Sequence, residues 1–386
     1  MSKIFFFILF LVAGAFSAVA FMYILGVSPV RFDNPILTTL DVKKPEIVGF
    51  LPYWLVVKAD KDYGKYITTL TYFGLTVGAD GRIQKLAKPG EEEPGWTTLK
   101  KNAFKKYNAK QSLLVISGDD GAIGEMINDP VTSAKNLVSD VAPIMKQYGF
   151  TDLNLDIETF MDASESARQN YTIFVTAVTQ IVHEQKLGTV TLDLIPISLV
   201  KQKLYDAKAL GAIVDRVVLM TYDYHYSGSF TSGGNAPLGG AGTSLEFDVE
   251  TAIKEAVKVM PAHKILMGIP LYGYEWETLR QAQGSATIPG GSATASVRRV
   301  SEMLKHCATC SAQFDEIARE PFIILPENDY FHQTYFENEQ SMKEKILLAQ
   351  KYHLGGVALW ALGYEDDTLL APISKYKNTL DLSGLY

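Results

Sequence analysis

The sequence lacks a basic cluster of the kind that nucleic-acid-binding proteins carry. Its 386 residues include 36 Lys and Arg against 43 Asp and Glu, which gives a formal net charge of −7. The one dense run of charge of a single sign, at 91–93, is acidic and is interpreted as a solvated loop. The composition therefore argues against nucleic acid as a partner.

Cysteine is scarce, since the chain contains only Cys307 and Cys310. Although His306 is adjacent, no second pair of ligands with the spacing of a zinc site accompanies this Cys-x-x-Cys. In a chain that lies outside the cell, such a pair is more typical of a local disulfide than of a redox centre or half of a zinc site. We therefore predict no metal and no cofactor.

The glycine-rich segment lacks the setting that a phosphate-binding loop needs. Gly233, Gly234, Gly239 and Gly240 lie close together, but no strand-turn-helix pattern surrounds them, so they indicate a flexible loop. An internal repeat of about 20 to 50 residues is not evident either. With 47% hydrophobic and 20% charged residues, the chain is typical of a globular protein that forms one large barrel or two ordinary domains.

Formal charge is missing from residues 4–27, a run of 24 residues that follows Lys3. A helix of that length crosses a hydrocarbon core of roughly 30 Å. The Ala-Val-Ala at 18–20 resembles a signal-peptidase site, but the apolar run continues to Leu25, beyond the signal-peptide core of about 7 to 15 residues. We therefore favour a transmembrane anchor at 1–27 over a cleaved signal peptide.

The charges beside this segment predict its orientation. Lys3 and the α-amine favour the cytoplasmic side, so the body is expected to be membrane-anchored and extracytoplasmic, or secreted if the segment is cleaved. Residues 28–45 contain three prolines and no sustained periodicity, which indicates a tether. The folded body is then expected at 46–386, and we expect it to be a monomer.

Short β-branched runs alternate with longer amphipathic stretches along the body. The predicted strands are 47–51, 69–77, 112–117, 153–158, 189–195, 216–222, 264–269 and 356–360. The predicted helices are 96–107, 132–148, 164–187, 249–260 and 341–352. Each helical stretch is too long for a hairpin and suits a right-handed crossover between parallel strands. Eight alternations predict an α/β fold, a (β/α)8 TIM barrel. The one oversized connection, about 275–340, predicts a small insertion between strands 7 and 8.

The predicted fourth strand ends in two acids. Side chains alternate along a strand, so Asn154, Asp156 and Glu158 share one face. A lone carboxylic acid is a weak catalyst at neutral pH, but a carboxyl group two residues away on the same face can keep it protonated and oriented. Because active sites of such barrels lie at the carboxyl ends of the strands, this pair indicates acid chemistry there.

Aromatic side chains end two further strands. Tyr222 and Asp223 follow the sixth predicted strand, and Trp360 ends the eighth. A phenol can hold an acyl oxygen, and an indole face offers an apolar floor on which a pyranose ring stacks. Together with the paired acids, these side chains indicate a sugar site.

These motifs resemble those of glycoside hydrolase family 18, the chitinase-like barrels, whose fourth strand carries Asp-Gly-x-Asp-x-Asp-x-Glu and whose sixth carries Met-x-Tyr-Asp. The matching residues are Asp156, Glu158, Met220, Tyr222, Asp223 and Trp360. Segments 268–276, 312–316 and 355–363 are most similar to the branch typified by spore-germination N-acetylglucosaminidases of the bacterial cortex. The resemblance implies a glycosidase that acts on β-linked N-acetylglucosamine in peptidoglycan-like or chitin-like glycans.

The resemblance also implies a retaining mechanism in which the 2-acetamido oxygen of the substrate attacks the anomeric carbon. Glu158 would protonate the glycosidic oxygen and later activate water, while Asp156 would hold the acetamide N–H. Tyr222 would donate to the acetamide oxygen, Asp223 would help to fix the distorted sugar, and Trp360 would form the floor.

Further candidates for substrate binding are weaker. Met220 belongs to the sixth-strand motif, Tyr272 to the segment at 268–276, and Asn154 to the acidic strand. Phe50 follows the first strand, where it either contacts sugar or packs in the core. His225 follows the sixth-strand motif, but a lone loop histidine is more often incidental.

Thr151, Asp152 and Asn154 depart from the family pattern, since they stand where it has Asp, Gly and Asp. Asn154 can hydrogen-bond Asp156 but cannot take up a proton, so we expect a reduced carboxylate relay behind Asp156. The family's Ser-x-Gly-Gly falls at 115–118 and loses a serine. A catalytically weak or lectin-like barrel and a retaining glycosidase with its own nucleophile therefore stay open as alternatives.

Overall fold

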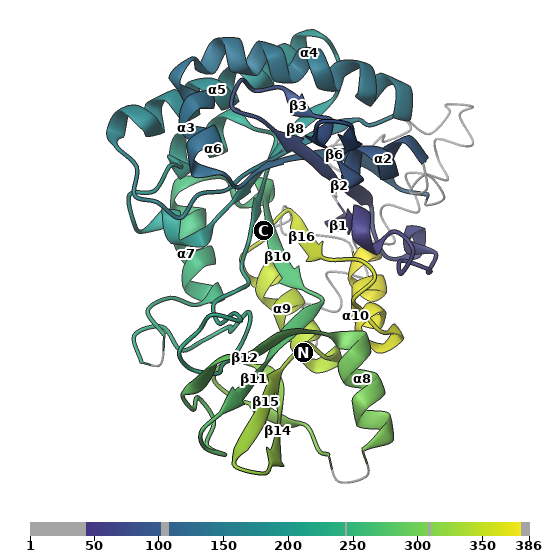
Figure 1. Cartoon of the computed structure of the whole chain (residues 1–386), viewed down its shortest axis with the longest axis vertical. Coiled ribbons are helices and arrows are strands. Elements are labelled where there is room, and N and C mark those ends of the chain that lie inside the picture. The colour runs from purple at the N-terminus through teal and green to yellow at the C-terminus, as the bar shows by residue number, and fades with distance from the viewer. Residues whose placement is uncertain (1–43, 102–107, 244, 308–309, 380–386) are drawn as a thin grey trace, which may run out of the picture. The chain divides into compact units, whose positions relative to one another are not determined.

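The computed structural model describes residues 44–101, 108–243, 245–307 and 310–379, which belong to one compact unit (Figure 1). The predicted segment at 1–27 and most of the predicted tether lie outside the described residues. Among the helices that the structure describes, none combines the length and the apolar character needed to cross a membrane.

Eight parallel strands close into a barrel. They are β1 (Glu46–Pro52), β2 (Thr69–Val77), β6 (Lys110–Ser117), β7 (Asp152–Ile157), β8 (Thr189–Leu194), β9 (Arg216–Leu219), β10 (Ile265–Pro270) and β16 (Gly356–Trp360). Each pairs with the next, and the barrel closes because β1 pairs with both β2 and β16. The predicted TIM barrel is confirmed, although the sixth strand ends at Leu219 and not at Tyr222.

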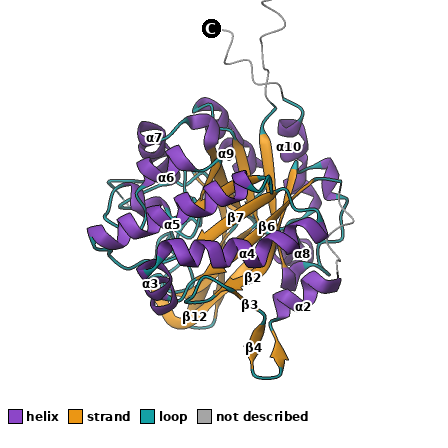
Figure 2. Cartoon of the chain, turned by 90° about the horizontal axis from the view of Figure 1, so that it is seen from above, coloured by secondary structure: helices purple, strands orange, loops and turns teal. Residues whose placement is uncertain are grey.

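Helices surround the strands (Figure 2). Those of the barrel are α2 (Pro94–Lys101), α3 (Asp120–Asn128), α4 (Pro130–Tyr148), α5 (Glu165–Glu184), α6 (Ala207–Ile213), α7 (Val249–Val259), α9 (Glu339–Lys351) and α10 (Asp367–Lys377). Most start at a side chain that accepts a first-turn N–H, as Ser164 does for α5 and Asp366 for α10. These caps fix where each helix begins after its strand.

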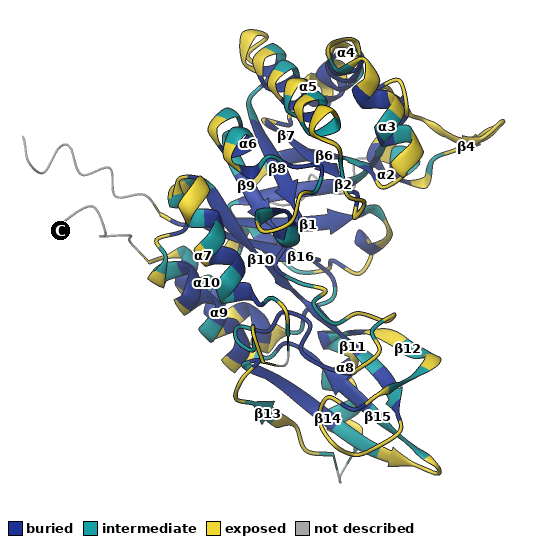
Figure 3. Cartoon of the chain, turned by 90° about the vertical axis from the view of Figure 1, so that its left-hand side faces the viewer, coloured by how far each residue is buried: buried dark blue, intermediate teal, exposed yellow. Residues whose placement is uncertain are grey.

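The barrel strands are buried on both faces, as the dark strands behind partly exposed helices show (Figure 3). Every residue of β7 and β10 is buried, because one face packs on the helices and the other fills the barrel. Burying a single aliphatic side chain of this kind stabilises the fold by about 1.5 to 3 kcal/mol. The strands therefore form a rigid support for the loops at their carboxyl ends.

The long connection between the seventh and eighth barrel strands forms a second, antiparallel sheet of five strands. Its elements are β11 (Tyr272–Thr278), β12 (Thr287–Ser296), α8 (Val297–His306), β13 (Gln313–Asp315), β14 (Glu320–Glu327) and β15 (Tyr330–Tyr335). The strand order is β12-β11-β15-β14-β13. Cys307 and Cys310, which follow α8, form a disulfide, as the sequence predicts.

The acidic run at 91–93 corrects one prediction. Two of its residues form β5 (Glu91–Glu92), which pairs with β4 (Leu86–Lys88) in a hairpin, so the run is not a loop throughout. β3 (Ile83–Gln84) pairs with β2 just before this hairpin. Both strands of the hairpin are exposed, as expected of a solvated segment, and the Glu92 carboxylate accepts hydrogen bonds at 2.6 Å from Lys100 of α2.

Asp152 starts β7 at the end of the barrel opposite to the carboxyl ends of the strands. Its carboxylate accepts hydrogen bonds from Ser112 at 2.6 Å, Thr189 at 2.6 Å and Thr191 at 3.0 Å. The guanidinium of Arg216 lies 3.6 Å from the same carboxylate. The aspartate that stands here in place of a glycine therefore has hydrogen-bonding and charged partners, which form a polar network at the far end of the barrel.

Candidate active site

Glu158 follows β7 directly at the carboxyl end of the barrel. Its backbone N–H donates to the carbonyl oxygen of Ser117 at 2.8 Å, which continues the pairing of β6 with β7 by one more bond. Asp156 shares the same face of the strand and is only 3% exposed. The strand thus holds one acid inside the barrel and the next at its mouth.

The environment favours the protonated form of both acids. Burial raises the pKa of Asp156 well above its usual range, and the negative charges of Glu158 and Asp193 raise it further. Burial also raises the pKa of Glu158, while the hydrogen bond from the Asp156 carboxyl opposes the rise and the charge of Asp223 adds to it. Two neighbouring carboxyl groups in such a site titrate as a pair that retains a proton toward neutral pH.

Asp193 of β8 is a third buried acid that the sequence analysis missed. It is 3% exposed, and its Oδ1 accepts a hydrogen bond at 3.0 Å from the side-chain amide of Asn154. Burial raises the pKa of Asp193 well above its usual range; the Asn154 hydrogen bond opposes this, and the charges of Glu158 and Asp152 add to it. The available signal was a single acid within an otherwise uncharged run at 189–195, on the predicted strand that follows the paired acids.

The amide of Asn154 hydrogen-bonds to an acid on the next strand. An asparagine at this position can hydrogen-bond Asp156, but the Nδ2 of Asn154 donates to Asp193 instead. Within the described part of the chain, Asn154 Oδ1 and Asp156 Oδ1 are buried without a hydrogen-bond partner. Asn154 is itself 1% exposed and is absent from the lining of the cavity described below, so its contact with substrate stays a prediction.

The sixth strand leaves the sheet early because its last residues turn toward the barrel mouth. Thr221 Oγ1 donates to the Gly268 carbonyl oxygen at 2.6 Å, which ties this turn to β10. Tyr222 follows, and burial, with the charges of Asp193 and Asp156, raises its pKa well above the usual range. Its phenol therefore keeps its proton and can donate a hydrogen bond at neutral pH.

Asp223 is held by two phenols. The hydroxyls of Tyr272 and Tyr274 donate to its Oδ1 at 2.5 and 2.9 Å. Although the residue reaches solvent, desolvation of the carboxyl group raises the pKa of Asp223, and these two hydrogen bonds oppose the rise. Tyr272 is 4% exposed and its hydroxyl donates to Asp223, so it orients this carboxylate, while its contact with substrate stays a prediction.

The backbone at Asp223 is strained and is held from the loop that follows. Its φ angle is 62°, in the left-handed region that non-glycine residues rarely adopt. The Asp223 N–H donates to Asn235 Oδ1 at 2.8 Å, and Asn235 Nδ2 donates to the Tyr272 carbonyl oxygen at 3.0 Å. Asn235 thus joins the loop that carries Asp223 to the start of the inserted sheet.

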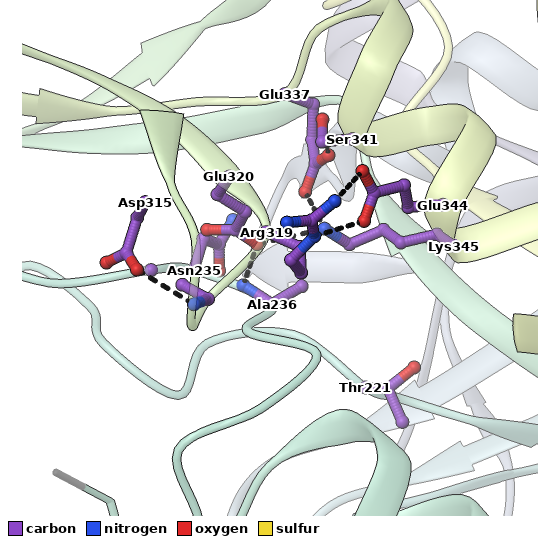
Figure 4. A network of polar contacts seen from close by, with 12 residues as sticks. Thr221, Asn235, Ala236, Asp315, Arg319, Glu320, Glu337, Ser341, Glu344 and Lys345 are labelled. Carbon is purple, nitrogen blue, oxygen red and sulfur yellow. Dashed lines mark hydrogen bonds and ion pairs between the residues drawn. The ribbon is translucent and has the colours of Figure 1, made fainter. Parts of the chain in front are cut away.

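A buried charge cluster supports this loop from behind (Figure 4). The Glu320 carboxylate of β14 accepts a hydrogen bond at 2.7 Å from the N–H of Ala236, and Lys345 of α9 lies 3.0 Å from the same oxygen. Lys345 also lies 2.7 Å from Glu337, and none of the three charged side chains is more than 1% exposed. The cluster therefore links α9, the inserted sheet and the Asp223 loop.

Trp360 ends β16 at the same mouth. Its indole packs against Phe50, with ring centroids 5.6 Å apart, and against Phe73, with ring centroids 5.0 Å apart. Phe50 is only 1% exposed, so of its two expected roles the structure supports packing in the core. Trp360 remains partly exposed above these rings and presents a supported aromatic surface.

A cavity of about 740 Å³ opens beside the acids. Its lining includes four of the predicted site residues, Glu158, Met220, Tyr222 and Asp223, together with Tyr224, Tyr226, Tyr274, Phe160, Phe247, Ile195, Pro196 and Ile197. His225 is absent from this lining, and its Nδ1 lies 2.9 Å from the Gly234 carbonyl oxygen. Histidine is thus part of the loop structure, while carboxyl groups and phenols supply the polar groups of the cavity.

The comparisons with known proteins agree with this geometry. Residues 46–365 match the profile of the family described as Glycosyl hydrolases family 18. The cortical fragment-lytic enzyme of Bacillus subtilis (strain 168) is 29% identical over 315 residues, which cover 79% of this chain and 67% of that protein. A probable chitinase 2 of Drosophila melanogaster is 25% identical over 247 residues, which cover 59% of this chain and 50% of that protein.

Solved structures share the fold. The spore cortex-lytic enzyme SleL of Bacillus cereus is 22% identical, with a TM-score of 0.69, over 88% of this chain and 75% of that chain. The Group IV chitinase of Ostrinia furnacalis is 20% identical, with a TM-score of 0.72, over 87% of this chain and 100% of that chain.

Proposed function

The chain belongs to glycosyl hydrolase family 18 and is a glycosidase, and on this basis we propose that it cleaves β-linked N-acetylglucosamine in an extracytoplasmic glycan. The observation that carries the proposal is the hydrogen-bonded pair of Asp156 and Glu158 at the mouth of the barrel, where burial raises the pKa of both carboxyl groups. A carboxylic acid that keeps its proton near neutral pH is what cleavage of a glycosidic bond requires.

We assign the bond cleavage to three side chains: Glu158 and Tyr222, which line the cavity, and Asp156, which is buried beside Glu158. Glu158 donates its proton to the glycosidic oxygen, and the 2-acetamido oxygen of the substrate attacks the anomeric carbon. Asp156 accepts the acetamide N–H, while Tyr222 donates to the acetamide oxygen that becomes the nucleophile. After the leaving group departs, the ionised Glu158 takes a proton from water, which opens the cyclic intermediate and gives a product with retained configuration.

Asp223 and Trp360 complete the site in this proposal. The ionised Asp223, oriented by Tyr272 and Tyr274, stabilises the positive charge that develops on the sugar ring. Trp360 supports the apolar face of that ring, because Phe50 and Phe73 hold the indole in place. The lining residue Met220 bounds the cavity without supplying a polar group.

The substrate class follows from the relatives and is part of the proposal. The cortical fragment-lytic enzymes among them favour a peptidoglycan-like glycan, and the chitinases favour a chitin-like one. We place the peptidoglycan-like glycan first, because the cortical fragment-lytic enzyme of Bacillus subtilis matches a larger share of the chain than the Drosophila relative does.

The location is proposed from the sequence alone. The uncharged run at 4–27 supports a membrane anchor with the barrel outside the cytoplasm, or secretion of the barrel if the segment is removed. We propose that the barrel acts as a monomer, since Glu158, Tyr222 and Asp223 line one cavity within a single chain.

The test compares the full chain with its Glu158→Gln variant on N-acetylglucosamine oligomers and on peptidoglycan fragments. We expect hydrolysis to fall by roughly 10²- to 10⁴-fold while binding of the oligomer changes little, because the amide keeps the shape but cannot donate the proton. Glu125→Gln, which changes an exposed glutamate on α3, serves as the control and should retain full activity.

Two results would redirect the assignment. Binding without hydrolysis by the unaltered chain would favour the lectin-like alternative. Equal turnover of a matched substrate with hydroxyl in place of the 2-acetamido group would favour an enzyme nucleophile, because substrate assistance needs the acetamide oxygen.

A further inference from the structure

Asp193 belongs to none of the motifs that identify the family, and the mechanism above does not use it. It stands on β8, the strand next to the one that carries Asp156. The register pairs Asn154 with Thr191 and Leu155 with Leu192, so Asp193 comes level with Asp156 inside the barrel. The barrel therefore has a buried acid beside Asp156 even though residue 154 is an asparagine.

The hydrogen bonds distinguish the two neighbouring acids. Asp193 Oδ1 accepts the Asn154 amide at 3.0 Å, whereas Asp156 Oδ1 is buried without a partner among the described residues. An amide donor stabilises an ionised carboxylate, and a buried oxygen without a donor favours the neutral acid. Burial raises the pKa of both acids, but only Asp193 has the opposing hydrogen bond from the Asn154 amide, so we place the negative charge of the set on Asp193 and the proton on Asp156 and its neighbour Glu158.

The surroundings of Asp193 contain several other titratable groups. They are Asp152, Asp156 and Glu158 from β7 and its end, Tyr222 after β9, and Tyr171 from α5. The pKa of each of these phenols is raised, so both stay neutral, and Asp152 is occupied by its own hydroxyl and guanidinium partners. The carboxyl groups that respond to a charge on Asp193 are therefore Asp156 and Glu158.

We propose that Asp193 is a positioning residue for the reaction: held by the amide of Asn154, its carboxylate replaces the relay carboxyl missing at residue 154 and keeps a proton on the Asp156 and Glu158 pair. This inference rests on the proposed function, because it assigns the source of the proton that Glu158 donates. Asp193 acts through Asp156 and does not touch the sugar.

The sign of the effect follows from the charges. Removing a negative charge beside the pair makes its fully ionised form less unfavourable, so the last proton leaves at a lower pH. In Asp193→Asn we expect the pKa at which the pair loses this proton to fall by about one unit, a tenfold change in proton affinity. The alkaline limb of kcat/KM should move to lower pH by the same amount, while KM changes little.

The experiment follows the carboxyl titration of Glu158 in the full chain by ¹³C NMR, with the resonance identified by its loss in Glu158→Gln, together with the pH profile of kcat/KM. A double variant, Asn154→Asp with Asp193→Asn, returns the carboxyl group to β7 and keeps one acid and one amide in contact. We expect it to restore both the titration and the alkaline limb. Asp152→Asn removes a buried acid that lies outside the pair, so it should leave the titration of Glu158 in place.

Three outcomes overturn the inference: an unchanged Glu158 titration in Asp193→Asn, an equal shift in Asp152→Asn, or no recovery in the double variant. The titration does not require turnover, so it separates this inference from the proposed function. If the full chain hydrolyses no glycan, the proposed function fails, and the role of Asp193 in holding the proton is still decided by the NMR measurement.

Discussion

The buried cluster behind the Asp223 loop makes a prediction that can be worked through from its charges. Glu337 is 1% exposed and lies beside Lys345, and burial, with the charge of Glu320, raises its pKa from 4.5 to about 8 against the opposing effect of the lysine. An acid whose pKa is higher in the folded state binds more protons when folded. The protein therefore loses stability as the pH rises from about 4.5 toward 8.

The size of this loss follows from the shift. A difference of about 3.5 units between the unfolded and folded pKa corresponds to about 5 kcal/mol over the whole range. Only the part between pH 5.5 and 8.5 is convenient to measure, and rearrangement around the cluster reduces it. We expect a contribution of roughly 2 to 3 kcal/mol in that window.

Glu337→Gln isolates the contribution. The amide oxygen can still accept the hydrogen bond that Ser341 Oγ donates to this side chain at 2.5 Å, but it does not titrate. Urea unfolding of both proteins at several pH values gives the difference in their unfolding free energies, in which every other titrating group is common to the two. That difference should rise in favour of the variant by roughly 2 to 3 kcal/mol between pH 5.5 and 8.5.

The control is Glu339→Gln, which changes an exposed glutamate two residues further on, in the first turn of α9. Its stability should run parallel to that of the unaltered protein at every pH. If the unfolding free energies of Glu337→Gln and the unaltered protein differ by the same amount at every pH, Glu337 is ionised in the folded state over the whole range measured. The cluster would then be a fixed ion pair, and the reasoning above would fail.

Two further predictions concern Asp223. Asn235→Ala removes the acceptor of the Asp223 N–H, so steady-state kinetics on oligomers should show a kcat lowered about tenfold or more, with a smaller change in KM. An unchanged kcat would mean that the left-handed turn at Asp223 keeps its conformation without this hydrogen bond. Tyr272→Phe removes a hydrogen bond that lowers the pKa of Asp223, so the acidic limb of kcat/KM should move to higher pH by roughly half a unit. If the acidic limb does not move, Asp223 is not the group whose ionisation activity requires.

The barrel could be predicted because its signals are local. The alternation of β-branched runs with amphipathic stretches marks strands that are buried on both faces, and the structure places β7 and β10 in this way. The sixth strand was predicted too long, since Thr221 and Tyr222 keep a strand-like composition while the backbone turns away from the sheet. The amino-acid composition of the segment does not predict where the backbone turns.

Site residues could be predicted where a motif lies within a single strand, and not where the contact depends on how two strands pair. Glu158, Tyr222 and Asp223 follow their strands and line the cavity together. Asp193 was missed because its partner Asn154 lies 39 residues away, and only the register of β7 with β8 brings the two together. The sequence left Phe50 open between sugar contact and core packing, and it did not reveal that Tyr272 supports Asp223, because an aromatic side chain near a strand end gives no sign of whether it faces the cavity or supports a neighbour.

The support of Asp223 has a consequence for how the protein is made. Its loop depends on Asn235 and Ala236, which are held in turn by Tyr272, by Glu320 and finally by Lys345, so the supporting residues come progressively later in the chain. During synthesis the ribosome must release residue 345 of 386 before the left-handed turn at Asp223 gains its full support. Glu158 leaves the ribosome well before Lys345 does, whereas Asp223 lacks its full set of supporting contacts until the later segment has followed. Because β16, which closes the barrel, also lies after residue 345, the closed barrel and the supported turn at Asp223 form together, late in synthesis.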